Sequence, residues 1–482
     1  MESSNPISIM TSPASDTPIR PQAAAIIMAA GKSTRMKSEF PKTVHPVCGL
    51  PLSLHVVRAC QAAGISRIVV VVGHQADSVK EALGTDVQYA LQKVQRGTGD
   101  AVAAAREELK DWDGDILILA GDAPLLKAET ITALLELRGS SGCPAVMLTA
   151  FLDDPTGYGR IIREPAVSGP IVRIVEQRDA TTEEKLIKEW SPSVYVFESA
   201  ALWPTLDRIE PNNSQGEFYL TDAVKILAAD GGRIESVVVQ DASETLGVNT
   251  RVELAQVTKI MQDRIRLAHM LAGVTMIDPQ NTYIDADVSI GTDTVLLPGT
   301  YLQGCTAVGN SCVIGPNTLV KDSKIGDGTT VAFSQVVLSQ IDTEVKVGPF
   351  ANLRPGTSLG HGVKIGDFVE LKNTTLHPNV QVNHLSYLGD CEVGANTNIG
   401  AGTITCNYDG FKKSRTEIGA DAFVGSHSTL IAPVTIGEGV IVAAGSIINK
   451  SVPADALAIS RAPQEVRPDA ARRFRSARKA RE

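Results

Sequence analysis

A six-residue repeat in the C-terminal half of this 482-residue chain constrains the fold more than any other feature. After about Ile277, an aliphatic residue followed by glycine recurs, and several neighbouring pairs lie six residues apart. A period of six is neither that of an α-helix nor that of a simple strand. It predicts a parallel β-helix, a triangular coil in which each side contributes one inward aliphatic residue and one turn. The repeated pairs are Ile290-Gly291, Val308-Gly309, Ile314-Gly315, Ile325-Gly326, Val347-Gly348, Leu359-Gly360, Ile365-Gly366, Val393-Gly394, Ile399-Gly400, Ile418-Gly419, Val424-Gly425 and Ile436-Gly437.

The composition agrees with this interpretation. The chain has 41 glycines and only 4% aromatic residues, which suits tight repeated turns filled by small aliphatic side chains. An ordinary β-sandwich with many turns is the alternative, but it does not explain the fixed phase of the repeat.

The repeat is interrupted between Thr405 and Thr416. This insertion holds Asn407-Tyr408-Asp409-Gly410 and Lys412-Lys413. Loops that leave a regular solenoid usually carry function, so we expect this loop to belong to a site.

The N-terminal half has a different pattern. Buried aliphatic runs at 24–28, 68–72 and 116–119 alternate with helical periodicity, which predicts a parallel α/β sheet of the Rossmann type. A polar helical pattern follows at 251–271 and is expected to link two domains. The Ser- and Pro-rich residues 1–21 lack the apolar core of a secretion signal and are expected to be a disordered extension.

Charge and cysteine content exclude several classes of function. A net charge of −9 argues against a nucleic-acid-binding protein, and no apolar run approaches the length that crosses a membrane. The seven cysteines form no C-x-x-C pair, so reduced thiols in a cytoplasmic protein are the simplest interpretation.

A phosphate-binding turn is expected directly after the first strand. Gly31 in this turn would direct backbone N–H groups at a phosphate, with charge added by Arg35 and Lys42. The spacing is not that of a Walker A loop. Asp122 follows the third strand at the same sheet edge, where a metal ligand is favoured over the alternative of a helix cap.

In the repeat region, His384 stands apart from the seven other histidines because it interrupts the repeat. Arg354, Lys372 and Tyr387 lie at neighbouring-coil spacings. Histidine is suited to act as a base near neutral pH, while arginine and lysine hold a phosphate. The other histidines are interpreted as structural or surface residues: His45, His55, His74, His269, His361, His377 and His427.

The motifs resemble those of a known family from about residue 23 to about residue 464. The first turn looks like the signature of sugar-1-phosphate nucleotidyltransferases. The order of the later motifs is similar to that of the bifunctional N-acetylglucosamine-1-phosphate uridyltransferase / glucosamine-1-phosphate N-acetyltransferase family. These motifs are Ala29-Ala30-Gly31, Thr34-Arg35-Met36, Pro41-Lys42, Gln92, Gly97-Thr98, Gly121-Asp122, Thr156-Gly157-Tyr158-Gly159-Arg160, Ile174-Val175-Glu176, Gln215-Gly216-Glu217 and Gly247-Val248-Asn249.

The resemblance implies two sets of site residues. The sugar-nucleotide set that it implies is Met28, Ala29, Ala30, Gly31, Arg35, Lys42, Gln92, Gly97, Thr98, Ala120, Gly121, Asp122, Gly159, Glu176, Ser191 and Asn249, with Asp122 and Asn249 as Mg²⁺ ligands. The acetyltransferase set has His384 as base, glucosamine 1-phosphate on Arg354, Lys372, Tyr387 and Asn398, and acetyl-CoA on Ala401, Asn407, Tyr408, Ser426, Ala444 and Arg461.

Two positions depart from the family pattern. Ser191-Pro192-Ser193 replaces Asn-Thr-Gly, which removes the amide expected to bind the N-acetyl sugar and one backbone donor. Ser33 replaces a glycine, and serine is comfortable there only if φ stays negative.

By resemblance, the chain is expected to consist of an α/β nucleotidyltransferase domain followed by a left-handed parallel β-helix. The expected divisions are an extension (1–21), the nucleotidyltransferase domain (22–250), a helical linker (251–275), the β-helix (276–460) and a basic tail (461–482). The expected enzyme acetylates glucosamine 1-phosphate and then uses UTP to make UDP-N-acetylglucosamine, as a homotrimer with the acetyl-CoA cleft between subunits. One alternative is an acetyltransferase whose nucleotidyltransferase half is weak or uses another sugar phosphate. In another, the β-helix is only a trimerisation scaffold.

Overall fold

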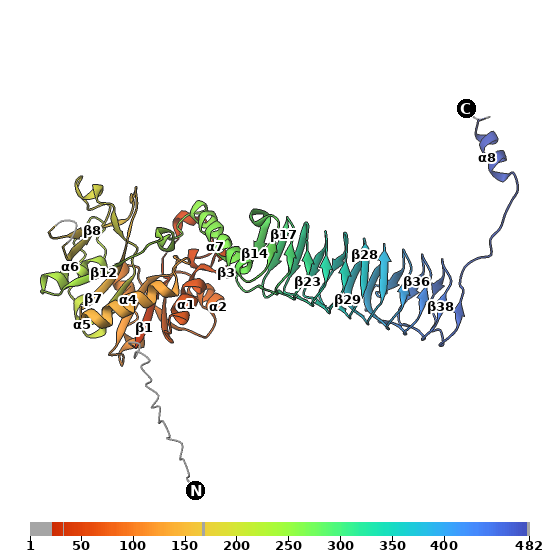
Figure 1. Ribbon diagram of the computed structural model, residues 1–482, viewed down its shortest axis with the longest axis horizontal. Helices are drawn as coiled ribbons and strands as arrows, with labels where there is room; N and C mark the ends of the chain where they lie inside the picture. The colour runs from red at the N-terminus through yellow and green to blue at the C-terminus, as the bar shows by residue number, and fades with distance from the viewer. Residues whose placement is uncertain (1–21, 32, 166–168, 480–482) are drawn as a thin grey trace, which may run out of the picture. The chain divides into compact units, whose positions relative to one another are not determined.

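The computed structural model describes residues 22–31, 33–165 and 169–479 (Figure 1). The extension expected at 1–21 lies outside the described residues. The chain divides into two compact units between Met261 and Gln262, within the long helix α7 (Arg251–Leu271).

The first unit is built on a mixed sheet in which the first four strands of the order given next are parallel and the fifth is antiparallel to both of its neighbours. Along the sheet the strands are β5 (Gln88–Leu91), β4 (Arg67–Val72), β1 (Ala23–Met28), β6 (Asp115–Ala120), β11 (Tyr195–Glu198), β7 (Ala145–Phe151), β10 (Glu189–Ser191), β8 (Gly159–Arg163) and β9 (Ile171–Val175), and β12 (Ile234–Val238) pairs with β7. The helices of this unit are α1 (Leu52–Ala62), α2 (Ala76–Leu83), α3 (Thr98–Ala103), α4 (Ala128–Ser141), α5 (Ser199–Leu206) and α6 (Thr221–Ala229).

Both faces of the central strands are buried. Along β1, Ala25 and Ile27 pack into one hydrophobic cluster, whereas Ala24 and Ile26 pack into another. Burial on both sides explains why the sequence shows continuous aliphatic runs rather than alternation. Since β1 and β6 are parallel, with Met28 opposite Ala120, their carboxyl ends meet at one sheet edge.

The second unit is a parallel β-helix, drawn from green to blue in Figure 1. One sheet contains β13 (Thr275–Met276), β16 (Val295–Leu296), β19 (Val313–Ile314), β22 (Thr330–Val331), β25 (Lys346–Val347), β28 (Lys364–Asp367), β30 (Gln381–His384), β32 (Asn398–Ile399), β35 (Phe423–Val424), β38 (Ile441–Val442) and β40 (Leu457–Ala458).

The second sheet of the β-helix covers its two other sides. One side has β14 (Thr282–Ile284), β17 (Thr300–Gln303), β20 (Thr318–Lys321), β23 (Gln335–Val337), β26 (Asn352–Leu353), β29 (Glu370–Leu376), β31 (Tyr387–Val393), β33 (Ile404–Cys406), β36 (Thr429–Ile431) and β39 (Ile447–Ile448). The other has β15 (Ser289–Ile290), β18 (Ala307–Val308), β21 (Lys324–Ile325), β24 (Gln340–Ile341), β27 (Ser358–Leu359), β34 (Thr416–Ile418) and β37 (Val434–Ile436), continued by the long strands β29 and β31.

The six-residue repeat determines the coil. In β17 and β20, Thr300 lies opposite Thr318, and Leu302 lies opposite Val320. The offset of three repeats is therefore one turn of the coil. Leu302 and Val320 are fully buried inside the helix, so the aliphatic position of each repeat forms the core.

Helix α7 covers the first coil. Gln262 Nε2 donates to the carbonyl of Ile284 at 2.8 Å, and Gln262 Oε1 accepts from its N–H at 3.0 Å. Arg266 Nη1 donates to the Thr282 carbonyl at 3.0 Å. These side chains satisfy backbone groups that the open end of a solenoid would otherwise expose. At the other end, α8 (Ala470–Lys479) follows the last coil in the sequence.

No helix among the described residues is long and apolar enough to span a bilayer. None of the seven cysteines, all of which the structure describes, forms a disulfide.

Truncation of the coil core tests this packing. Leu302→Ala is expected to destabilise the β-helix by about 2–5 kcal/mol, because it leaves a cavity that neighbouring coils fill only in part. Denaturant unfolding followed by circular dichroism measures the loss. The neighbouring Gln303→Ala, which removes only a half-buried polar side chain, should change stability by about 0.5 kcal/mol or less. Equal effects of the two changes would contradict the inward assignment of Leu302.

Candidate functional site

In the first unit, four polar side chains converge beyond the carboxyl ends of β1 and β6. Lys42 forms an ion pair with Asp122, and its Nζ lies 3.0 Å from Asn249 Oδ1. Arg35 Nη2 donates to the same amide oxygen at 2.9 Å. The Val248 N–H donates to the carbonyl of Asp122 at 2.9 Å, which joins the two segments that carry the oxygen ligands.

These oxygens fit a divalent cation. The carboxylate of Asp122 and the amide oxygen of Asn249 face one positive group, the Lys42 ammonium, which stands where a metal ion would be attracted. Among the described residues there is no cluster of three or more His, Cys, Asp or Glu side chains that would form a complete metal cage. Mg²⁺ requires none, because it binds through one or two carboxylates, water and substrate phosphates.

The phosphate turn holds Ser33 in the left-handed region. Its φ is 56°, so the condition under which serine would be comfortable at this position is not met. Its hydroxyl accepts from the Lys42 N–H at 2.8 Å and donates to the Gly31 carbonyl at 3.3 Å. These two hydrogen bonds hold a serine in a conformation that glycine adopts more readily. Around this turn, Ala29 and Ala30 are buried, Met28 and Ala120 are half-buried, and Gly31 is exposed.

A second group follows strand β5. Gln92 is buried, and its Nε2 donates to the Gly97 carbonyl at 3.2 Å and to Asp100 at 2.8 Å. Gly97 has φ 125°, and a side chain there would collide with the backbone of Phe218. Thr98 Oγ1 accepts from the Leu220 N–H at 2.9 Å. The turn around Gly97 is therefore fixed from two sides and requires glycine.

The residues expected at the sugar lie together on β8, β10 and the end of β9. Ser191 is paired with Gly159 across the antiparallel strands, and a Cβ on Gly159 would lie 3.5 Å from Glu176 Oε1. Burial raises the pKa of Glu176, which lines a cavity of about 170 Å³. Ser191 is buried, and its hydroxyl is 3.0 Å from the Tyr195 hydroxyl.

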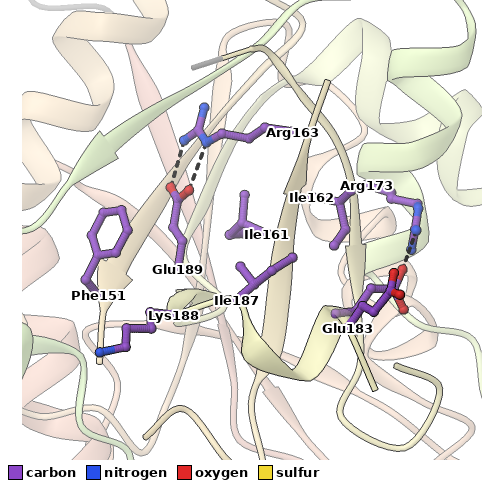
Figure 2. A pocket seen from close by; sticks show the side chains of 10 residues that line it. Phe151, Ile161, Ile162, Arg163, Arg173, Glu183, Ile187, Lys188 and Glu189 are labelled. Atoms are coloured by element: carbon purple, nitrogen blue, oxygen red, sulfur yellow. Dashed lines mark hydrogen bonds and ion pairs between the residues drawn. The ribbon is translucent and has the colours of Figure 1, made fainter. Parts of the chain in front are cut away.

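The cavity in Figure 2 lies elsewhere on these strands. Its volume is about 510 Å³, and its floor includes Ile161 and Ile187. Arg163 forms a bidentate pair with Glu189 at 2.7 and 2.8 Å, so the charges at this wall satisfy one another. None of the residues predicted from the sequence lines it, and its cationic side chains are paired with carboxylates: Arg163 with Glu189, Arg173 with Glu184 and Lys188 with Asp153.

In the β-helix, the predicted acetyltransferase residues lie on successive coils. His384 ends β30 and Tyr387 begins β31, so these two residues flank the same corner. Arg354 Nη1 donates to Glu370 Oε1 at 2.8 Å, and Glu370 lies opposite Tyr387 between β29 and β31. Lys372 lies opposite Gly389, where a side chain would collide with the Tyr387 hydroxyl.

The insertion between Thr405 and Thr416, which was expected to belong to a site, places Lys413 beside a predicted site residue, although no individual role was predicted for Lys413. Tyr408 and Lys413 pair as an antiparallel bridge, which folds the loop back on itself. Lys413 lies beside Lys372, and this contact lowers the pKa of Lys372. Asn407 Nδ2 donates to Asp390 Oδ2 at 2.5 Å. Lys413 could not be assigned from its spacing because the loop breaks the repeat.

Asp367 is a second residue that the sequence-based site lacks. Its Oδ1 lies 2.5 Å from Nδ1 of His384. In the structure, β28 and β30 are neighbouring strands, and Asp367 lies directly opposite His384. A sequence separation of one coil is therefore the signal that could have identified this pair.

The expected acetyl-CoA residues follow the coils in order. The His427 N–H donates to the Ala401 carbonyl at 2.7 Å, and the Gly445 N–H donates to the Ser426 carbonyl at 2.8 Å. Arg461 Nη1 donates to the Ala444 carbonyl at 2.7 Å. Asn398 lies on β32, in the coil after His384. Ser426, Ala444, Arg461 and Tyr408 are exposed, so this face is open for a ligand.

Comparisons with known proteins agree with both units. Residues 25–218 match the MobA-like NTP transferase domain, and residues 415–450 match six repeats of the bacterial transferase hexapeptide. The bifunctional protein GlmU of Brevibacillus brevis is 48% identical over 440 residues, which cover 91% of this chain and 95% of that protein. Those of Halalkalibacterium halodurans and Caldanaerobacter subterraneus are 48% and 50% identical over the same length, covering 96% and 95% of those proteins. Since the similarity extends over both units, the chain belongs to the family of the bifunctional protein GlmU.

Proposed function

We propose that this bifunctional transferase acetylates glucosamine 1-phosphate with acetyl-CoA and then transfers UMP from UTP to the N-acetylated product, releasing pyrophosphate. The acetyl transfer is assigned to residues 276–460 and the uridyl transfer to residues 22–250, with 251–275 as the linker. The observation that carries the proposal is that His384 with its hydrogen-bonded carboxylate and three cationic side chains lie on neighbouring coils of the β-helix.

In acetyl transfer, His384 takes the proton from the substrate amine as its nitrogen attacks the thioester carbon. The C–N bond forms, the C–S bond breaks, and the proton passes to the departing sulfur of CoA. Arg354, Lys372 and Lys413 supply positive charge for the sugar phosphate, whereas Tyr387 and Asn398 supply polar groups for the sugar. This division of roles separates the base from the cations, as the acetylation of a phosphorylated amino sugar requires.

In uridyl transfer, the already ionised phosphate of N-acetylglucosamine 1-phosphate attacks the α-phosphorus of UTP, and no base is required. Asp122 and Asn249 would hold Mg²⁺, which when bound neutralises charge on the leaving pyrophosphate. Arg35 and Lys42 add positive charge at the same sheet edge. Met28 to Gly31, Ala120, Gly121, Gln92, Gly97 and Thr98 would surround the nucleotide, and Gly159, Glu176 and Ser191 the sugar.

The open face from Ala401 to Arg461 is assigned to acetyl-CoA. We assign Ala401, Asn407, Tyr408, Ser426, Ala444 and Arg461 to this ligand, with a second subunit of a homotrimer completing the cleft. The absence of disulfides among the seven cysteines supports a cytoplasmic location.

Removing the proposed base tests the acetyltransferase. His384→Ala is expected to lower kcat for acetyl transfer by about a hundredfold or more, because no other group takes the proton. Uridyl transfer should be unchanged. The matched control is His377→Ala, which removes a histidine paired with Glu392 at 2.9 Å outside the proposed site. Near-normal acetylation by His384→Ala, measured as CoA thiol release, would refute the base assignment.

Removing the proposed metal ligand tests the uridyltransferase. Asp122→Ala is expected to abolish pyrophosphate release at ordinary Mg²⁺ concentrations and to leave acetylation intact, because a carboxylate oxygen is lost where the leaving charge develops. Asp207→Ala, which removes an exposed carboxylate paired with Arg106, is the control. The ligand role fails if both variants release pyrophosphate at the wild-type rate.

Ser191 stands where the family resemblance leads us to expect asparagine. The variant Ser191→Asn therefore tests sugar selectivity, and with it the alternative of a weakened uridyltransferase. The buried Ser191 hydroxyl already faces Tyr195, so little remains of it to recognise an N-acetyl group. The loss of one hydrogen bond, worth about 0.5–1.5 kcal/mol, predicts a several-fold higher KM for N-acetylglucosamine 1-phosphate. Ser191→Asn should lower this KM by part of that factor. Both sugar phosphates are compared in the uridyl reaction. Strong native preference for the acetylated sugar, unchanged by the substitution, would show that another group makes this contact.

A further inference from the structure

The carboxylate of Asp367 is hydrogen-bonded to the ring of His384. Oδ1 lies 2.5 Å from Nδ1, and both side chains reach the surface. The backbone fixes this pairing, because Asp367 and His384 are directly opposite in the parallel strands β28 and β30. The hydrogen bond from His384 lowers the pKa of Asp367, so this carboxyl group is ionised at neutral pH.

An ionised carboxylate has no proton to donate, so it accepts from the ring. Nδ1 of His384 therefore carries hydrogen, and in the neutral imidazole the lone pair is left on Nε2. A base needs a free lone pair that points at its substrate, and a ring fixed at one nitrogen presents the other in a constant direction. The negative charge also stabilises the imidazolium that forms when Nε2 takes a proton.

We propose that Asp367 is a positioning residue for acetyl transfer, which holds His384 by Nδ1 and presents Nε2 to the substrate amine. The proposal rests on the proposed function, because it presupposes that His384 is the base. Asp367 moves no proton itself: the amine proton goes to Nε2 and then to the sulfur of CoA.

Other histidine–carboxylate pairs on the β-helix differ from this one. Glu392 faces His377 at 2.9 Å, but Arg415 also forms an ion pair with Glu392 and shares its charge. For Asp367, His384 is the only ion-pair partner within residues 22–31, 33–165 and 169–479, and Asp367 is likewise the only carboxylate paired with His384 there. The charge of Asp367 is thus directed at the proposed base alone.

The test is Asp367→Asn in the full-length protein, with CoA thiol release measured against pH. The amide keeps the shape of the side chain but loses its charge. We expect kcat for acetyl transfer to fall by about 10–100-fold, with KM for glucosamine 1-phosphate unchanged. A wild-type rate across this pH range would overturn the proposal.

Two controls separate positioning from other roles. Glu392→Gln makes the same carboxylate-to-amide change opposite His377 and should leave acetylation and its pH profile unchanged. In the His384→Ala background, Asp367→Asn should cause no further loss, because it acts only through the missing ring. A further loss in the double variant, or a change confined to KM, would place Asp367 in substrate binding and overturn its positioning role.

Failure of the inference differs from failure of the proposed function. An inactive His384→Ala beside a normal Asp367→Asn would overturn the positioning role and leave the base assignment standing. Full acetylation by His384→Ala would overturn both. Circular dichroism spectra that match the wild type check that the β-helix is folded in each variant.

Discussion

The backbone register between successive coils is the constraint on which the C-terminal unit depends. Parallel hydrogen bonds join each coil to the next with an offset of about three repeats, as between Thr300 and Thr318. A slip of one residue would turn the buried Leu371 and Leu388 outward. The burial of these aliphatic side chains therefore fixes the register, and the same register places Asp367 opposite His384.

In the N-terminal unit the corresponding constraint is the parallel pairing of β1 and β6. Both strands end at one sheet edge, so the turn after Met28 and the segment of Asp122 are adjacent although they are far apart in the sequence. Chain segments leave the sheet at this edge, and the polar side chains of Lys42, Asp122 and Asn249 meet there.

Much of the fold was predictable because buried side chains recur at regular intervals along the sequence. The glycine-marked repeat predicted the β-helix, the aliphatic runs predicted β1, β4 and β6, and the motifs predicted the family that the comparisons confirm. The cap formed by Gln262 and Arg266 was not predicted, since a polar side chain that binds backbone at an open end has no period. The positive φ of Ser33 was not predicted, because its conformation depends on a hydrogen bond with Lys42 nine residues away.

The sequence by itself determined the two units, the residue types of both candidate sites and the base His384 as a hypothesis, because each depends on local pattern or motif. Only the tertiary structure decided which charges meet. Lys413 reaches Lys372 through the folding of an irregular loop, and Asp367 reaches His384 through the stacking of coils. Electrostatic contacts act over a few ångströms in space regardless of separation along the chain, so residues outside every motif enter a site only when the backbone has been placed.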